Sequence, residues 1–560
     1  MNANRATLRS VLVLILLATL PSIAHAQTAP PSGGQLLQQV QPPPPPPPQK
    51  SAPVTIQAPS QAPAAATVAF RVTHIAIDGN SVFDTATLHA LVANAEGTRL
   101  DLVGLDAVAA RITAFYHAHG YPLARAIVPA QTIQDGTVHV QVLEALYDHV
   151  RLDNRSRVDA NLLHAFLATL APGALITTAG LDNSLLRLGD LPGVDARATL
   201  SPGSQVGTSD LDVNVEPLPT VYGNVRLDNS GNRYTGRLRA GASLYAANPF
   251  RHGDLLSLDA LTSGRDLTYG RLGYQTTLNG HGTALGGSTS ALRYRLGRGL
   301  EALAAHGVAG VESAWLQRPF VRTAASSMYG RLQVDAKRLR DRIDSTGLRD
   351  DRHSHSATAS LVMQSVDTLG GGGITTSSLG VTRGLLYFDD AVAAAADAAT
   401  AQTAGSFTRW NASVARLQRL ATHTRLYVAL TSQGTHGNLD ASEQLQLGGV
   451  DSVRGYEVGT LAGASGYQAS VELRHDLVWS GPGQWEGRVF FDAGDVSVNP
   501  RPWTAGPNRA HLSAWGLGLQ WTGPDQWLAS LQVAQPISST RDLAGTPPPT
   551  RVWLQISRGF

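Results

Sequence analysis

The second half of the chain alternates apolar and polar residues over many short segments, and this pattern most constrains its fold. From residue 221 to residue 560 the segments are separated by glycine, asparagine, aspartate and proline. In one of them Leu332, Val334 and Ala336 share a face, and charged or amide side chains occupy the other. A strand with one apolar and one charged face needs two different solvents. A closed barrel supplies lipid outside and water inside, so we predict a transmembrane β-barrel.

The number and spacing of the segments fit a barrel over residues 220–560. We count sixteen candidate antiparallel strands, and single-chain bacterial barrels have an even number. About 21 residues are available per strand with its share of loop, and a spanning strand needs about 9–11. All nine tryptophans lie in this region, as aromatic girdles at two membrane interfaces would require. The alternative is a soluble all-β domain with an aromatic core, but arginines that recur on one strand face oppose it.

Residues 1–26 have the features of a secretory signal peptide. Arg5 and Arg9 form a basic start, residues 11–20 are apolar, and a small-residue cleavage site ends at Ala26. The alternative is an uncleaved anchor, although the apolar stretch is too short to cross a bilayer as a helix.

Residues 27–68 are predicted to be a polar linker. Residues 34–40 could form two turns of helix, and the proline run at residues 42–48 predicts a semi-rigid polyproline spacer. Such a spacer would let a helix at its front reach a place remote from the following domain. A disordered tail without a role is the alternative.

Residues 69–146 and 147–219 are predicted to be two α/β units with the same β-α-α-β-β order. The elements expected in the first unit lie at residues 70–77, 85–95, 102–119, 124–128 and 137–143. Those expected in the second lie at residues 150–152, 159–170, 181–188, 196–200 and 209–215. Two consecutive units of one order indicate an internal repeat, with a pair of amphipathic helices over a small sheet.

The composition excludes several classes of function. The chain has no cysteine, and therefore no disulfide, thiolate metal site or cysteine nucleophile. Its formal net charge is +2 and its basic residues form no stripe, so we expect no nucleic-acid partner. Phosphate-loop, serine-hydrolase and zinc-protease motifs are missing from the sequence. The aspartates and histidines at residues 350–355 are interpreted as a solvated loop. We therefore predict no enzymatic activity, no catalytic residue, no cofactor and no metal site.

A short stretch at residues 489–494 differs from the other barrel segments. Phe490, Asp492 and Gly494 share one strand face, and Phe491 belongs to the other, apolar face. The apolar face is expected to contact lipid, so Asp492 should point into the lumen. A carboxylate inside a barrel needs a partner, and an arginine can supply a bidentate one.

A second stretch, Val453, Arg454, Gly455 and Tyr456, lies in a long segment between two strands. Arg454 is the candidate partner of the lumen carboxylate if this segment folds into the barrel. Gly455 would allow a tight turn, and Tyr456 would pack at its tip. On the residues alone, a solvated arginine and an unrelated strand aspartate are the simpler interpretation.

Both stretches resemble motifs of outer-membrane barrels that carry POTRA domains. Residues 453–456 look like the signature of the sixth extracellular loop in that superfamily, and residues 490–494 resemble its lumen-facing F-x-D-x-G strand motif. The resemblance implies that the loop folds back into the barrel and that Arg454 contacts the strand motif. The terminal aromatic residue, Phe560, resembles the C-terminal assembly signal of such barrels.

The order of segments is similar to that of the TpsB transporters of two-partner secretion, which include the exporters of haemolysin and filamentous haemagglutinin. The resemblance implies a protein translocase in the outer membrane of a Gram-negative bacterium, with its POTRA domains in the periplasm. They would bind the secretion domain of an unfolded exoprotein, the TpsA partner, which passes through the barrel without ATP. In the family an N-terminal helix can sit in the pore.

Further expected partners are outer-membrane lipid and, during biogenesis, the barrel-assembly machinery. The alternative function is that of a barrel-assembly or insertion factor of the same superfamily, although such factors typically carry more POTRA units. A passive porin or a plugged nutrient receptor would not explain residues 69–217.

Overall fold

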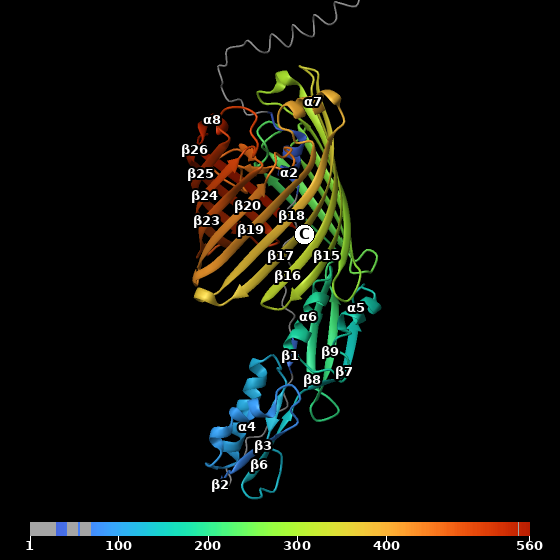
Figure 1. The fold of residues 1–560 in the computed structure, drawn as a ribbon, viewed down its shortest axis with the longest axis vertical. Helices are drawn as coiled ribbons and strands as arrows, with labels where there is room; N and C mark the ends of the chain where they lie inside the picture. The colour runs from blue at the N-terminus through green and yellow to red at the C-terminus, as the bar shows by residue number, and fades with distance from the viewer. Residues whose placement is uncertain (1–29, 42–53, 57–68, 547) are drawn as a thin grey trace, which may run out of the picture.

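The computed structural model describes residues 30–41, 54–56, 69–546 and 548–560. The predicted signal peptide and the proline run lie outside these ranges. The described residues form a barrel and two small α/β units, which follow one another below the barrel in Figure 1. Among the residues that the structure describes, no helix is long and apolar enough to cross a membrane.

Sixteen antiparallel strands close into one barrel, which confirms the predicted fold class. Each strand pairs with its neighbours in chain order, and the last strand pairs back with the first. Closure leaves no edge, so the wall satisfies its own backbone hydrogen bonds. The strands are β10 (Val221–Asp228), β11 (Arg239–Ala247), β12 (Leu255–Thr262), β13 (Leu267–Thr277), β14 (Ala284–Arg295), β15 (Ala305–Arg322), β16 (Ser326–Ile343), β17 (Leu348–Asp367), β18 (Gly373–Phe388), β19 (Gly405–Ala421), β20 (Thr424–Thr435), β23 (Ser465–Leu477), β24 (Gln484–Ser497), β25 (Arg509–Thr522), β26 (Trp527–Ser539) and β27 (Arg551–Gly559).

The two ends of the barrel differ. Strand β10 continues from the second α/β unit, so its first residue marks the end of the barrel that adjoins the two units. At the opposite end, long loops carry the short helices α7 (Ala391–Ala399) and α8 (Arg541–Ala544), which Figure 1 shows at the top.

The tryptophans do not all form girdles. Trp485 lies near Trp479 and Trp521, with ring centroids 6.3 and 6.1 Å away, beside turns at the end of the barrel that adjoins the two α/β units. Trp315 and Trp553, however, are buried on the lumen side, where each indole N–H donates to a protein oxygen. The prediction that all nine tryptophans serve as girdles is therefore wrong for these two, because a lumen filled with polar groups offers acceptors for the indole.

The two α/β units share one sheet topology. Their first and last strands pair in parallel, and the strand before the last pairs antiparallel with it. In the first unit these elements are β3 (His74–Asp78), α3 (Thr85–Ala90), α4 (Leu102–Ala118), β5 (Arg125–Ile127) and β6 (Thr137–Leu143). In the second they are β7 (Leu146–Asn154), α5 (Ala160–Leu167), α6 (Thr178–Gly189), β8 (Val194–Pro202) and β9 (Thr208–Pro217). Each unit has its own apolar core between helices and sheet.

The first unit departs from the sequence prediction at two places. The predicted strand at residues 70–77 is divided into β2 (Phe70–Arg71) and β3, because buried Val72 exchanges backbone hydrogen bonds with the chain at residues 97–98. The predicted helix at residues 85–95 ends at Ala90 and continues as the 3-10 turn η1 (Ala93–Ala95). The domain boundaries themselves stay predictions.

A strand that the sequence did not reveal extends the sheet of the second unit. Strand β1 (Val54–Ile56) lies in the predicted linker and pairs in parallel with β8. Val54 packs against the core of this unit. The sheet order is therefore β1-β8-β9-β7, with the linker strand at one edge.

A buried ion pair joins the second unit to the barrel. Nε and Nη2 of Arg322, at the end of β15, donate to both carboxylate oxygens of Asp190 at 2.7 and 2.8 Å. The hydroxyl of Tyr329 donates to the same carboxylate at 3.1 Å. This bidentate contact fixes the direction in which α6 meets the barrel rim.

Replacing Leu361 with arginine is expected to destabilise the barrel by up to about 4 kcal/mol, because a lipid-facing charge costs most near the bilayer midplane. Leu361 of β17 lies on the exposed, apolar face of the wall. The matched control is Ser360→Arg, on the lumen face of the same strand. Urea titration in lipid vesicles, followed by tryptophan fluorescence, measures both. Equal losses for the two variants would contradict the assignment of faces.

Candidate functional site

The segment between β20 and β23 folds into the barrel. It carries a short hairpin of β21 (Leu445–Leu447) and β22 (Leu461–Gly463). A buried apolar cluster joins the segment to the lumen side of β24 and β25; its members are Leu447, Val453, Tyr456, Leu461, Val496, Ala510, Leu512 and Ala514. We call residues 436–464 the lumen loop, because they are packed within the barrel.

One ion pair brings the two sequence motifs together. Nε and Nη2 of Arg454 donate to the two carboxylate oxygens of Asp492 at 2.8 and 2.6 Å. The backbone N–H of Arg454 donates to the same carboxylate at 3.1 Å. Asp492 is fully buried, and Arg454 is nearly so. A bidentate pair fixes both position and direction of the arginine, and removing either partner would leave an uncompensated buried charge.

Further groups surround the guanidinium of Arg454. Its Nη1 donates to Glu472 at 2.7 Å, and its Nη2 donates to the hydroxyl of Ser470 at 3.0 Å. The guanidinium carbon lies 3.4 Å from the centroid of the Phe490 ring, and the indole of Trp553 donates to the Arg454 carbonyl at 2.8 Å. Sequence reasoning did not select Glu472, Ser470 or Trp553 as site residues. Strand alternation was the signal that could have placed Glu472 in the lumen.

Two glycines let the lumen loop approach the wall closely. A Cβ on Gly455 would lie 2.7 Å from the Cβ of Ala514 and 3.0 Å from the backbone nitrogen of Pro536. A Cβ on Gly494 would lie 2.9 Å from the side chain of Leu447 in the loop. A side chain at either position would therefore displace the loop.

The other residues selected from the sequence lie at two places. Val453 and Tyr456 are buried in the loop, and the Tyr456 hydroxyl donates to the carbonyl of Ser538 at 2.8 Å. Phe560 lies away from the loop, at the barrel seam, where its backbone N–H and C=O pair with Gly223 at 3.0 Å each. Its role in assembly stays a prediction.

Helix α2 (Gly33–Val40) also lies inside the barrel, and Figure 1 shows it in the half remote from the small units. Ser32 and Gln35 form a capping box at its start. The backbone N–H of Gly33 donates to Asp341 of β16 at 3.0 Å. Leu36 and Leu37 are buried in an apolar cluster with lumen residues of β12 to β16. The sequence predicted this helix, but not that it packs against the wall.

Helix α2 and the lumen loop are bonded to each other. The amide of Gln446, beside the motif-bearing turn, donates to the Gln35 carbonyl at 3.0 Å and to Oε1 of Gln38 at 2.8 Å. In return Gln39 donates to Oε1 of Gln446 at 2.8 Å, and Gln38 donates to the carbonyl of Ser442. The two segments therefore form one obstruction within the lumen.

Residues 350–355 are not a solvated loop, so that interpretation is wrong. They belong to β17, whose pairing with β16 continues beyond the length that a membrane requires. Arg352 is buried there among carboxylates, 3.2 Å from Asp341 and 2.9 Å from Asp440, and also pairs with Asp350. The aspartates thus compensate an arginine inside the barrel.

A closed barrel with an apolar outer face, filled by a helix and a bonded loop and preceded by two small α/β units, is the architecture of an outer-membrane transporter. The chain matches the family described as haemolysin secretion/activation protein ShlB/FhaC/HecB over residues 207–521, and the ShlB-type POTRA domain over residues 70–145. It belongs to the ShlB/FhaC/HecB family.

Characterised relatives agree with this family. The heme/hemopexin transporter protein HuxB of Haemophilus influenzae is 26% identical over 481 residues, which cover 85% of this chain and 84% of HuxB. The outer membrane transporter CdiB of Escherichia coli strain 536 is 24% identical over 459 residues, which cover 77% and 73%. The solved structure of CdiB from Escherichia coli superposes with a TM-score of 0.71 at 19% identity, covering 99% and 98% of the two chains.

The protein is therefore an outer-membrane translocase of the two-partner secretion type, with its POTRA domains in the periplasm of a Gram-negative cell. The first α/β unit, which the POTRA match covers, and the second unit, which shares its sheet topology, are from here called the first and second POTRA domains.

The variant Gly455→Ala is expected to displace the lumen loop, because its new methyl group would meet Ala514 and the backbone of Pro536. Arg454 is itself a trypsin site, so cleavage after it should become faster in the detergent-purified protein. Mass spectrometry of the digest measures this. Gly437→Ala is the matched control, because a Cβ there meets no atom within 4 Å and the position lies in the same loop. Equal protection of both variants would show that the close approach does not hold the loop.

Proposed function

We propose that the protein exports an unfolded exoprotein through its barrel and that the POTRA domains bind the secretion domain of this client. The proposal rests on how α2 and the lumen loop are held inside the barrel. Helix α2 and the lumen loop are held mainly by side-chain contacts and lie outside the strand pairing of the wall. They can leave without breaking the barrel, and a client strand can then pass.

The ion pair of Arg454 and Asp492 is proposed to be a structural latch. It holds the lumen loop in the closed position, and none of its groups is placed to act on a covalent bond of a client. The sequence has no phosphate-binding loop, so we propose that no nucleotide drives export. Folding of the client outside the cell would supply direction. On this proposal the protein is not an enzyme.

The sheet edges of the POTRA domains are where an extended client could add a strand. In the first domain two outward N–H groups are already bonded: Ile75 of β3 donates to Glu96 at 2.8 Å, and Ala126 of β5 donates to Thr113 at 2.9 Å. In the second domain β1 covers the edge of β8. Such protection prevents unwanted pairing between sheets.

The edge of β8 is the docking place that we propose for the client. Its present occupant, β1, is only three residues long and contributes few backbone hydrogen bonds. A client strand of greater length can replace it by β-augmentation. Because β1 and α2 belong to the same N-terminal segment, occupation of the periplasmic edge is then linked to the segment that fills the pore.

Export itself is tested by expressing the chain in a Gram-negative host together with a candidate exoprotein, chosen as a large secreted protein from the neighbouring genes. We expect the exoprotein in the medium with the intact chain and less of it with Arg454→Ala, since the unpaired buried Asp492 costs about 3–5 kcal/mol and leaves less of the correctly folded transporter. Arg488→Ala is the control. Arg488 lies on the same face of β24 as Asp492, but it bonds to Glu486 and Gln520 of the barrel wall and not to the lumen loop. If the exoprotein stays in the periplasm although the barrel is inserted, export fails and barrel assembly becomes the function to test.

The docking place is tested with an engineered disulfide, since the natural chain has no cysteine. Thr55 and Thr199 are register partners on β1 and β8, and parallel strands about 4.8 Å apart permit a bridge between them. The double variant Thr55→Cys with Thr199→Cys should block export until a reductant is added. The control pair, Asp153→Cys with Asn214→Cys, bridges β7 and β9 of the same sheet and should export normally. Normal export with the β1–β8 bridge formed would exclude this edge.

A further inference from the structure

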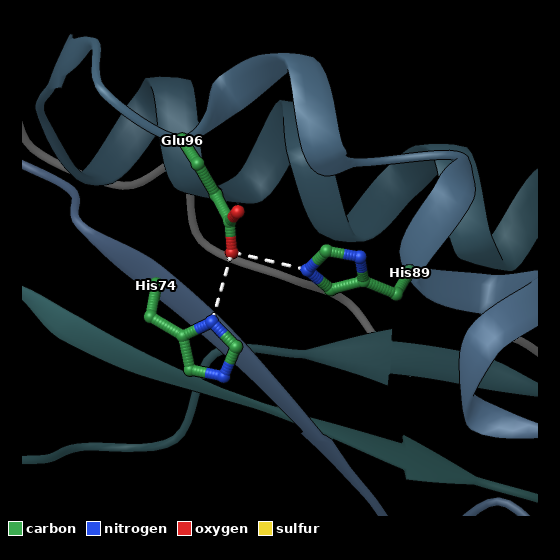
Figure 2. Close-up of side chains that lie close together, drawn as sticks. All are labelled: His74, His89 and Glu96. Carbon is green, nitrogen blue, oxygen red and sulfur yellow. Dashed lines mark hydrogen bonds and ion pairs between the residues drawn. The ribbon is translucent and has the colours of Figure 1, made fainter.

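Two histidines and a glutamate converge on the first POTRA domain, far from the lumen loop. Nδ1 of His74 lies 3.1 Å and Nε2 of His89 lies 3.0 Å from the same oxygen of Glu96 (Figure 2). One atom from each residue can be chosen so that all three lie within 4.8 Å of one another. His74 comes from β3, His89 from α3, and Glu96 from the turn that follows η1.

This arrangement fits the first coordination sphere of zinc. Zinc binds imidazole nitrogen and carboxylate oxygen at about 2.0–2.2 Å, so tetrahedral ligand atoms lie about 3.3 Å apart. Two of the three separations are already close to that value. The side chain of His74 is 59% exposed, so its ring has room to adjust the third separation, and water can reach a fourth position.

Glu96 is held in place by a group that is not a ligand. The backbone N–H of Ile75 donates to its carboxylate at 2.8 Å. Outer contacts of this kind orient the ligands of metal sites.

A second cluster, on the second POTRA domain, provides a contrast. Asp148, His149 and Asp210 also lie close together. Arg151 already donates to Asp210 at 2.7 Å, and the backbone and hydroxyl of Ser204 both donate to Asp148 at 2.6 Å. A metal ion there would compete with the Arg151 cation. Glu96 instead contacts two imidazoles and one backbone N–H, and no lysine or arginine bonds to it within the part of the chain that the structure describes.

We propose that His74, His89 and Glu96 bind a zinc ion, with water as the fourth ligand. Imidazole and carboxylate donors suit zinc, and the periplasmic side of the protein is open to it. The bound ion would tie the α3–η1 segment to β3 along the outer edge of the first POTRA sheet. The site is independent of the proposed export pathway, so its test can succeed or fail separately.

The test uses the full chain, purified in detergent without a polyhistidine tag and freed of metal by dialysis against a chelator. Zinc chloride is then titrated against a chromophoric chelator. We expect about one equivalent bound per chain, and an affinity lower by about tenfold or more in His89→Ala and in Glu96→Gln. Cobalt(II) should give the visible absorption of a four-coordinate site, and this absorption should be lost in both variants.

Two control variants test whether zinc binds at this cluster. His139→Ala removes a histidine of the same domain whose imidazole contacts Asp78, and His149→Ala removes the histidine of the second cluster. Neither should change zinc affinity. The proposal is overturned if the intact chain binds no zinc, or if the control variants lose as much affinity as His89→Ala. Circular dichroism and gel mobility show that each variant is folded, so that a loss of binding is not a loss of structure.

Discussion

A chain that crosses lipid has to satisfy all of its backbone hydrogen bonds within itself, and the pairing of β10 with β27 meets this constraint. This closed seam determines how the lumen can be used and how it can be blocked. A wall without an edge offers no side exit, so a passage can run only along the lumen. Whatever blocks the lumen has to be held by contacts other than the strand ladder. Helix α2 and the lumen loop meet this condition, since side-chain hydrogen bonds, ion pairs and apolar contacts hold them.

The lumen stabilises these segments by matching buried charges. Arg454 faces two carboxylates, Arg352 is surrounded by aspartates, and Lys337 and Arg409 share Glu443. A buried pair adds little net stability compared with apolar packing, but it strongly favours one position over others. Charge pairing therefore specifies where the loop sits while leaving the cost of its removal moderate. Strand pairing in the barrel wall stabilises the fold, and the lumen contacts determine the position of the loop.

Alternation predicted the barrel, its strand number and the inward direction of Asp492, because these depend on local periodicity. The motif resemblance predicted the partner, Arg454, which periodicity could not. Strand β1 escaped detection because three residues within a proline-rich linker carry no pattern, and their pairing depends on β8. The cluster of His74, His89 and Glu96 was not predicted for a related reason. The turn after α3 brings these residues together, although no regular spacing in the sequence connects them. The interpretation of residues 350–355 as a loop was wrong because pairing with β16 extends their strand beyond the membrane.

The mutual hydrogen bonds of Gln446 with α2 have a consequence for gating. If the helix leaves, the amide of Gln446 loses its partners; if the loop leaves, the glutamines of the helix lose theirs. Removal of one segment therefore weakens the hold on the other, and partly open states are disfavoured relative to closed and fully open ones. Such coupling makes opening cooperative. A single pore should then switch between two discrete current levels instead of widening by degrees.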